Sequence, residues 1–201
     1  MEKQGQKLGI FNFMNFFKQF IKDPITTGAI VSSSKDLSEL ITQTARLDEK
    51  KCVVELGPGI GVFTKEIMRR ISPQCVFFCL EINQQLVEAT RKNCPQAIVY
   101  HASAQEIKKY LLQHHQNSCD CIISGLSWAL FDQPLQDDLL NALYDSLEPG
   151  GVFLTFAYIH GPLFSRGNRF RKLLNIKFKK VERTKIVWKN LLPAFVYYCT
   201  K

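Results

Sequence analysis

The stretch Glu55-Leu56-Gly57-Pro58-Gly59-Ile60-Gly61 follows a short apolar run, residues 52–54, which has the composition of a buried strand. A glycine-rich turn directly after a strand lets a ligand approach the backbone closely, because no Cβ atom blocks it. A second acid, Glu81, ends the next apolar run, residues 75–80. In nucleotide-binding sheets an acid at this position holds the ribose hydroxyls. The pair predicts a ligand with an adenosine portion.

The spacing of the glycines and the charge beside them indicate which cofactor binds. The dinucleotide pattern is G-x-G-x-x-G, whereas here the third glycine comes one residue early. The carboxylate of Glu55 would repel a pyrophosphate but attract an ammonium or sulfonium group. S-adenosylmethionine (SAM) carries both cationic groups and no phosphate. We therefore predict SAM rather than NAD; the alternative is a strand-to-helix turn that only packs tightly.

The bulk composition is that of one globular domain. The chain has 201 residues, of which 46% are hydrophobic, enough to bury a single core. No apolar run approaches the roughly 20 residues that span a bilayer, and the polar start is not that of a signal peptide. The seven cysteines lack C-x-x-C spacing, which predicts reduced thiols in a cytoplasmic protein and no metal site.

The positive charge is concentrated near the C-terminus. The net charge is +8, and residues 166–189 contain ten basic side chains and one acid, Glu182. Such asymmetry indicates an anionic partner, either nucleic acid or an anionic membrane surface. The alternative is a solvated face without a partner.

The N-terminal segment has the pattern of an amphipathic helix over residues 10–22, which Asp23-Pro24 ends. Its many phenylalanines and its lysines suit a membrane interface, with rings in the acyl boundary and lysines toward the headgroups. The expected membrane contacts are Phe13, Phe17, Lys18, Phe20 and Lys22. The alternative is a helix that covers the core or the active site. We expect one domain over residues 1–201, with residues 1–45 as an N-terminal helical extension.

From residue 51 onward, expected strands and helices alternate. The expected strands are residues 51–56, 75–81, 97–101, 119–124 and 151–158. The expected helices are residues 62–71, 84–93, 104–113 and 134–146. Two further strands, 177–187 and 194–200, form a terminal antiparallel pair. This order predicts an α/β fold: a Rossmann-like, seven-stranded, mostly parallel sheet with an antiparallel C-terminal strand and helices on both faces.

The chain resembles class I SAM-dependent methyltransferases from the glycine loop to the C-terminus, most specifically over residues 53–64. Four further segments resemble bacterial phospholipid N-methyltransferases: residues 16–24, 28–34, 124–126 and 187–197. The resemblance implies an enzyme that associates with the inner face of the membrane and methylates the amine of phosphatidylethanolamine and its methylated derivatives.

The resemblance also implies the cofactor-binding residues, which are Glu55, Gly57, Gly59, Gly61, Glu81, Ile82, Ser103, Ala104 and Ser124. Glu81 would take the ribose hydroxyls, and Ile82 would lie beside the adenine. Relatives often have an acid where this chain has Ser103. A serine hydroxyl can still hydrogen-bond the base edge, but without charge.

Two residues mark the end of the fifth expected strand, where parallel sheets place their reactive edge. We expect Tyr158 to position the substrate and His160 to be a candidate base. Ordinary strand-end residues are the alternative for both. The lipid phosphates would be bound by Arg166, Arg169, Arg171 and Lys172.

The stretch Gly125-Leu126-Ser127-Trp128 is similar to the Asn-Leu-Pro-Tyr stretch of ribosomal RNA adenine dimethylases. Gly125 and Ser127 depart from that pattern, so nucleic acid is not the favoured partner. Trp128 would instead face a cationic headgroup or the sulfonium, or else lie in the core. Two alternatives to lipid methylation stay open: an rRNA adenine N-methyltransferase, and a non-catalytic SAM-binding module at the membrane.

Overall fold

A computed structural model describes residues 35–161, 165–190 and 192–201, and the structural statements below concern these residues. They lie in a unit that comprises Ser33–Lys201. The predicted helix over residues 10–22, with Phe13, Phe17, Lys18, Phe20 and Lys22, lies outside the described residues.

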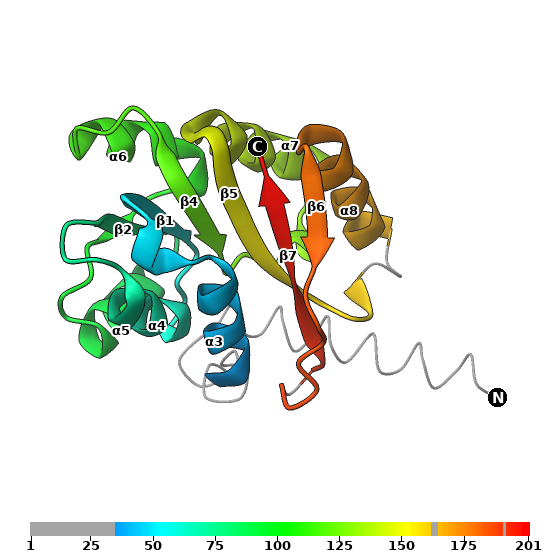
Figure 1. Ribbon diagram of the computed structural model, residues 1–201, viewed down its shortest axis with the longest axis horizontal. Coiled ribbons are helices and arrows are strands. Elements are labelled where there is room, and N and C mark those ends of the chain that lie inside the picture. Colours follow the sequence, from blue (N-terminus) through cyan, green and yellow to red (C-terminus); the bar gives the residue numbers. More distant parts are fainter. Residues whose placement is uncertain (1–34, 162–164, 191) are drawn as a thin grey trace. The chain divides into compact units, whose positions relative to one another are not determined.

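The centre of the unit is a seven-stranded sheet with the order β3-β2-β1-β4-β5-β7-β6 (Figure 1). Its strands are β1 (Cys52–Leu56), β2 (Val76–Glu81), β3 (Val99–His101), β4 (Cys119–Ser124), β5 (Leu147–Tyr158), β6 (Lys180–Arg183) and β7 (Ala194–Thr200). Strand β7 runs antiparallel to both of its neighbours, β5 and β6. The other pairings are parallel, which confirms the predicted fold class.

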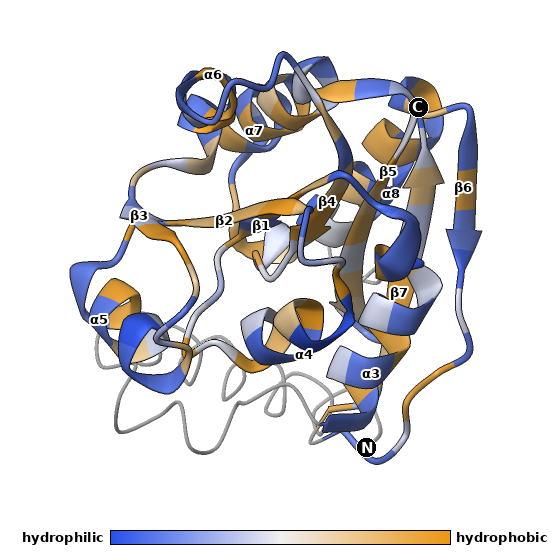
Figure 2. Ribbon diagram, turned by 60° about the vertical axis from the view of Figure 1, so that its left-hand side comes forward, coloured by the Kyte–Doolittle hydropathy of each residue, from blue (hydrophilic) through white to orange (hydrophobic). Residues whose placement is uncertain are grey.

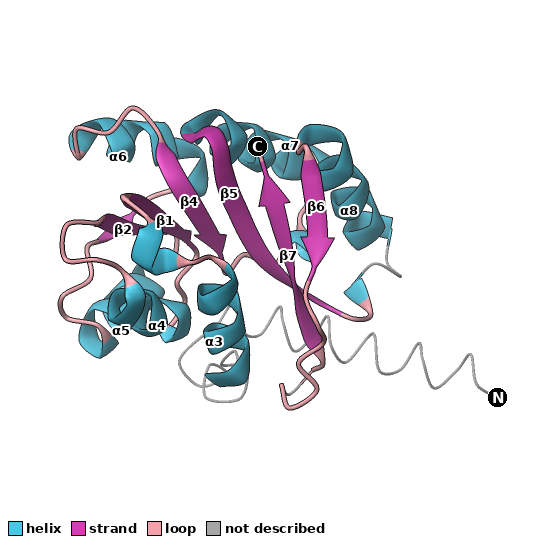
Figure 3. Ribbon diagram, viewed as in Figure 1, coloured by secondary structure: helices cyan, strands magenta, loops and turns pink. Residues whose placement is uncertain are grey.

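Helices cover both faces of the sheet (Figure 3). They are α3 (Lys35–Thr44), α4 (Val62–Arg70), α5 (Gln84–Asn93), α6 (Ile107–Gln113), α7 (Gln133–Ser146) and α8 (Ser165–Lys177). One buried cluster joins the sheet to α6, α7 and α8, and a second joins its other face to α3, α4 and α5. The central strands are predominantly apolar, whereas edge strand β6 is mostly hydrophilic (Figure 2). A sheet buried on both faces needs strands of this kind.

Three elements differ from the sequence-based expectation. Helix α8 was not predicted, because its many basic residues and Gly167 obscure the apolar positions Phe170 and Leu174, which are buried. The strand expected over residues 177–187 is shorter, since α8 extends into it and β6 ends at Arg183. The turn expected at residues 147–151 is part of β5, where the register against β4 shifts.

The strand order places the functional edge. The chain continues from β1 to β2 on one side of the sheet and from β4 to β5 on the other, so β1 and β4 flank a topological switch point. Ligands of open α/β sheets bind outside the carboxyl ends of the strands at such a point. The glycine loop follows β1, and residue Gly125 follows β4.

Candidate functional site

The glycine loop turns through three residues with positive φ: Gly57, Gly59 and Gly61. A Cβ atom added to Gly59 would meet no protein atom within 4 Å, so its backbone borders open space. Its φ of +63° is one that side chains with a Cβ rarely adopt. The loop therefore exposes a stretch of backbone that a ligand can approach closely.

The loops after β1 and β4 are in direct contact. The Gly125 N–H donates a hydrogen bond to the Leu56 carbonyl at 2.8 Å. A Cβ atom on Gly125 would lie 2.3 Å from the Gly57 carbonyl oxygen. A side chain at position 125 would therefore displace the glycine loop.

Glu81 joins the end of β2 to the glycine loop. Its carboxylate accepts hydrogen bonds from the backbone N–H of Gly59 at 3.3 Å and of Asn83 at 3.0 Å. Burial raises the pKa of this carboxyl group, while the backbone N–H donors act in the opposite direction. The next side chain, Ile82, is 71% exposed. A carboxylate beside an exposed apolar side chain fits a nucleoside, whose hydroxyls donate to the acid while its base covers the apolar surface.

Glu55 lies beneath the loop and is fully buried. Its Oε2 accepts hydrogen bonds from the Thr64 hydroxyl at 2.7 Å and the Cys79 thiol at 3.3 Å. Its Oε1 has no hydrogen-bond partner among the described residues. Burial raises the pKa of Glu55 to about 7. Glu55 thus ties β1 to α4 and β2, and it keeps one oxygen for a further donor or a cation.

Ser103 follows β3 and forms a local cap. Its Oγ accepts from the Gln105 N–H at 3.2 Å, and Glu106 accepts from the Ser103 N–H at 3.3 Å. This capping box begins the short 3₁₀ helix Ala104–Glu106. The structure therefore places Ser103 and Ala104 at the expected strand end and gives the serine hydroxyl a structural role.

Ser124 and Trp128 organise the loop after β4. The buried Ser124 hydroxyl accepts from the Leu126 N–H at 3.2 Å and the Trp128 indole N–H at 3.1 Å. The Trp128 ring is 3% exposed and stacks on Phe170 with centroids 4.5 Å apart. It lies in the core, which was the alternative interpretation of this residue, and is not available to face a headgroup or the sulfonium.

The four basic residues expected to bind lipid phosphates divide into two pairs. Arg169 donates both Nη2 hydrogen bonds to Asp137, at 2.9 and 2.6 Å, and Arg166 donates to the Leu130 carbonyl at 2.8 Å. These contacts fasten α8 to α7 and to the 3₁₀ turn Trp128–Leu130. Arg171 and Lys172 are exposed and line a separate cavity beside β6.

Tyr158 ends β5 and pairs with Ala194 of β7. Its ring packs edge-on against Phe156, and burial raises its pKa to about 12. The phenol therefore keeps its proton at neutral pH, which suits positioning of a substrate rather than proton abstraction. His160 follows two residues later and is exposed.

The described residues include no group of three or more His, Cys, Asp or Glu side chains that could hold a metal ion. All seven cysteines are free, and six of them are buried. No helix in the described part of the chain has the length and apolar content required to cross a membrane.

Comparison with known proteins assigns this site to a class. Residues 53–151 match the methyltransferase domain family. The chain is 26% identical over 191 residues to the ornithine lipid N-methyltransferase of Singulisphaera acidiphila, covering 94% of this chain and 95% of that protein. Its fold resembles the O-methyltransferase of Bacillus cereus in complex with SAH, with a TM-score of 0.70, 13% identity, and 93% and 91% of the two chains covered. It also resembles an O-methyltransferase of Streptomyces achromogenes in complex with SAM, with a TM-score of 0.64, 14% identity, and 85% and 82% covered.

The chain is a class I SAM-dependent methyltransferase, and SAM is its methyl donor. Within that class it is related to lipid N-methyltransferases, and this similarity extends along almost its whole length.

The buried Glu55 predicts a pH-dependent stability. Its folded-state pKa of about 7 lies above the ordinary glutamate pKa of 4.5, so the unfolded chain loses this proton first as pH rises. Between pH 5 and 8 the free energy of unfolding should therefore fall by about 2 to 3 kcal/mol more in the wild type than in Glu55→Gln. Urea unfolding of the SAM-free protein at both pH values measures this difference. Parallel pH dependences of the two proteins would show that Glu55 ionises normally.

Proposed function

We propose that this methyltransferase transfers the methyl group of SAM to the amine of a membrane lipid, with phosphatidylethanolamine and its methylated derivatives as acceptors. The observation that carries the proposal is the similarity to the ornithine lipid N-methyltransferase, which covers 94% of this chain. That relative also supports a second acceptor, the free amine of an ornithine lipid. Both acceptors present an amine on a lipid headgroup.

The cofactor site is proposed to include the glycine loop and the ends of β1 and β2. Glu81 accepts from the ribose hydroxyls, and the exposed Ile82 covers one face of the adenine. The open backbone at Gly59 faces the methionine portion, and the unpartnered Glu55 oxygen provides negative charge for a cationic group. Ser103, Ala104 and Ser124 form the adjoining strand ends.

SAM, when bound, supplies a methyl group on a positively charged sulfur. The chain has to align an amine with that methyl group and exclude water. The attacking amine must be neutral, and a nearby positive charge lowers its pKa. The protonated Tyr158 phenol has an oxygen that can accept a hydrogen bond from the amine N–H and so orient its lone pair. His160 is the proposed proton acceptor.

The connection between β6 and β7 supports action at a membrane surface. The backbone of Val187 pairs with that of Ala194 and its side chain is buried, whereas its neighbours Ile186 and Trp188 are exposed. Trp188 is 68% exposed, and lysines flank the pair at positions 185 and 189. Tryptophan and lysine together suit the bilayer interface, where the indole lies among the headgroups and the ammonium group reaches the phosphates.

This connection is located at the reactive edge. Ala194 pairs with Tyr158 at the carboxyl end of β5, and the Ile159 N–H donates to the Pro193 carbonyl at 3.0 Å. A membrane contacted by Trp188 would therefore lie at the edge where the substrate amine must enter. The sequence contained this signal, because Lys185 and Lys189 flank the apolar residues 186–188.

The burial of Trp128 disfavours RNA methylation. In RNA-binding sites an exposed aromatic ring stacks on the base. Here the ring at the corresponding position is packed against Phe170 in the core. The basic segment suits RNA and anionic lipid equally, so it does not separate the two substrates.

A labelling experiment tests the acceptor. Purified chain is incubated with tritiated-methyl SAM and, in parallel, with vesicles containing phosphatidylethanolamine, vesicles containing ornithine lipid, amine-free phosphatidylglycerol vesicles and ribosomal RNA. We expect label in an amine lipid and none in phosphatidylglycerol. Label in RNA alone would contradict the proposal, and SAM binding without label in any acceptor would support the non-catalytic alternative.

Removal of the exposed apolar side chains from the connection between β6 and β7 should weaken membrane binding. The double variant Ile186→Ser/Trp188→Ser should bind anionic vesicles about tenfold or more weakly, since burial of each large apolar side chain contributes on the order of 1.5 kcal/mol or more. Ile98→Ser is a matched control, because Ile98 is also exposed but precedes β3 at the opposite edge of the sheet. Vesicle sedimentation measures membrane binding by the double variant and by the control. Equal binding by the wild type and the double variant would exclude this connection from the membrane contact.

A further inference from the structure

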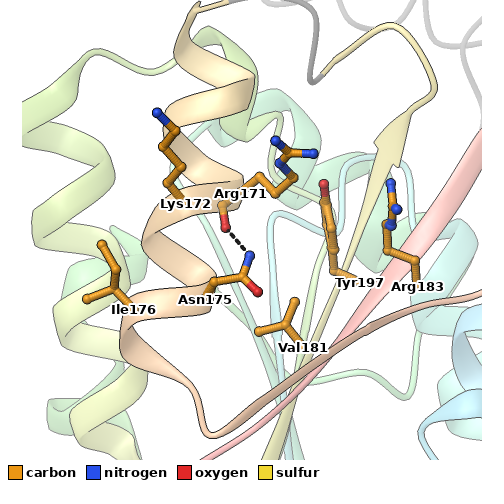
Figure 4. Close-up of a pocket in the computed structure, with 7 residues that line it drawn as sticks. All are labelled: Arg171, Lys172, Asn175, Ile176, Val181, Arg183 and Tyr197. Atoms are coloured by element: carbon orange, nitrogen blue, oxygen red, sulfur yellow. Dashed lines mark hydrogen bonds between the residues drawn. The ribbon is translucent and has the colours of Figure 1, made fainter.

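A cavity of about 550 Å³ lies between α8 and strands β6 and β7 (Figure 4). Strand β7 is three positions from β1 in the sheet, with β4 and β5 between them. The cavity therefore does not belong to the cofactor site. Helix α8 contributes Arg171 and Lys172, β6 contributes Arg183, and β7 contributes Tyr197.

The described lining of this cavity is basic and includes no acid. Arg171, Lys172 and Arg183 are exposed, and none of them forms an ion pair with another residue in the described ranges. Arg171 donates to the Asn168 side chain at 3.1 Å, and the Arg183 guanidinium lies over the Phe195 ring.

Glu182, the acid nearest in sequence to Arg183, does not neutralise the three basic side chains of the cavity. Glu182 pairs with Lys180 at 2.9 Å. Because side chains of a strand alternate between its two faces, Lys180 and Glu182 lie on the face of β6 opposite Val181 and Arg183, which line the cavity. The three cations thus lack a counter-charge within the described chain.

The Tyr197 hydroxyl provides a second, independent observation that points to a ligand in this cavity. Tyr197 is 2% exposed, and its hydroxyl has no hydrogen-bond partner among the residues that the structure describes. Phe195 and Phe170 hold the ring from two sides, with centroids 4.9 and 6.4 Å from it. In Figure 4 the hydroxyl points toward the side of the cavity where the Arg171 and Arg183 guanidinium groups lie.

A buried hydroxyl without a partner is costly, so native proteins rarely keep one without a reason. Burial raises the pKa of Tyr197, while Arg183 and Arg171 act in the opposite direction. The phenol therefore remains a donor at neutral pH. A ligand that satisfies a phenol donor and two guanidinium groups together must present several negatively charged oxygens.

We propose that this cavity binds a phosphoryl oxyanion, the phosphodiester of an anionic lipid headgroup, at a site separate from that of the methyl donor. Arg171 and Arg183 hold the phosphate oxygens, Lys172 adds charge, and the Tyr197 hydroxyl donates to one oxygen. The inference stands apart from the proposed function, because it requires neither methyl transfer nor an amine on the bound lipid.

The apolar part of the lining favours a lipid over other phosphates. Ile176, which is 81% exposed, and Val181 both line this cavity. Free phosphate would gain nothing from such side chains, whereas the glycerol and acyl region of a lipid covers them. Nucleic acid is disfavoured, since single-strand binding needs exposed stacking rings and the aromatic residue in this lining is buried.

The test compares two double variants that remove the same charge. Arg171→Gln/Arg183→Gln removes the guanidinium groups of the cavity. Lys179→Gln/Lys180→Gln removes two nearby basic residues that do not line it. Tyr197→Phe keeps all the charges and removes only the hydroxyl. Each full-length protein is titrated by calorimetry with glycerophosphoglycerol, with inorganic phosphate and with a short RNA, and by sedimentation with phosphatidylglycerol vesicles.

We expect saturable binding of glycerophosphoglycerol and of phosphatidylglycerol vesicles by the wild type, with inorganic phosphate bound more weakly. Binding should fall about tenfold or more in Arg171→Gln/Arg183→Gln, about threefold or more in Tyr197→Phe, and less than twofold in the lysine control, because charge-assisted hydrogen bonds are stronger than diffuse surface attraction. A cooperative thermal unfolding transition and SAM binding equal to that of the wild type show that each variant is folded.

Four results would overturn the inference: no headgroup binding at low salt, equal losses in the two double variants, inorganic phosphate bound as tightly as the headgroup, or binding of RNA but not of vesicles. Headgroup binding without methyl transfer to any amine lipid would defeat the proposed function alone. Methyl transfer without headgroup binding would defeat this inference alone.

Discussion

Two buried carboxyl groups at the ends of adjacent parallel strands impose the constraint on which the site depends. Glu55 is the penultimate residue of its strand and lies under the glycine loop, and Glu81 ends the neighbouring strand. Burial raises the pKa of both groups, so the charged forms are disfavoured unless donors or cations are near. The fold supplies a hydroxyl, a thiol and two backbone N–H groups. One oxygen of Glu55 remains without a partner. In the proposed site, a cofactor with hydroxyl donors and positive charge completes this arrangement.

The proposed cofactor site and the proposed membrane contacts lie on different strands of the sheet. In the proposed site, the ends of β1, β2 and β3 form the nucleoside side, and the end of β5 supplies Tyr158. Strands β6 and β7 extend the sheet beyond β5 and provide two surfaces, the exposed Ile186 and Trp188 at the reactive edge and the basic cavity against α8. In the proposed account the membrane is contacted by the part of the fold that is farthest in the sheet from the adenine.

The glycine loop, Glu81 and the alternating strands could be predicted because their signals are local in the sequence. A run of apolar residues followed by glycines indicates a strand end regardless of the rest of the chain. Helix α8 was missed because few of its residues are apolar, and its stability depends on distant partners such as Asp137 on α7, which pairs with Arg169. Whether Trp128 is exposed or buried also depends on α8, because Phe170 of that helix covers its ring. The cavity at Tyr197 required three elements to be placed together, which no local pattern specifies.

The central claim is that Glu81 and the loop hold the nucleoside of SAM. Calorimetric titration of the full chain with SAM tests it most directly, using Glu81→Gln and, as a control of identical chemistry, the exposed Glu88→Gln on α5. The account predicts that Glu81→Gln weakens SAM binding about tenfold or more, because hydrogen bonds to a charged acceptor are lost, while Glu88→Gln binds like the wild type. If folded Glu81→Gln binds SAM as tightly as the wild type, the cofactor lies elsewhere and the account is contradicted.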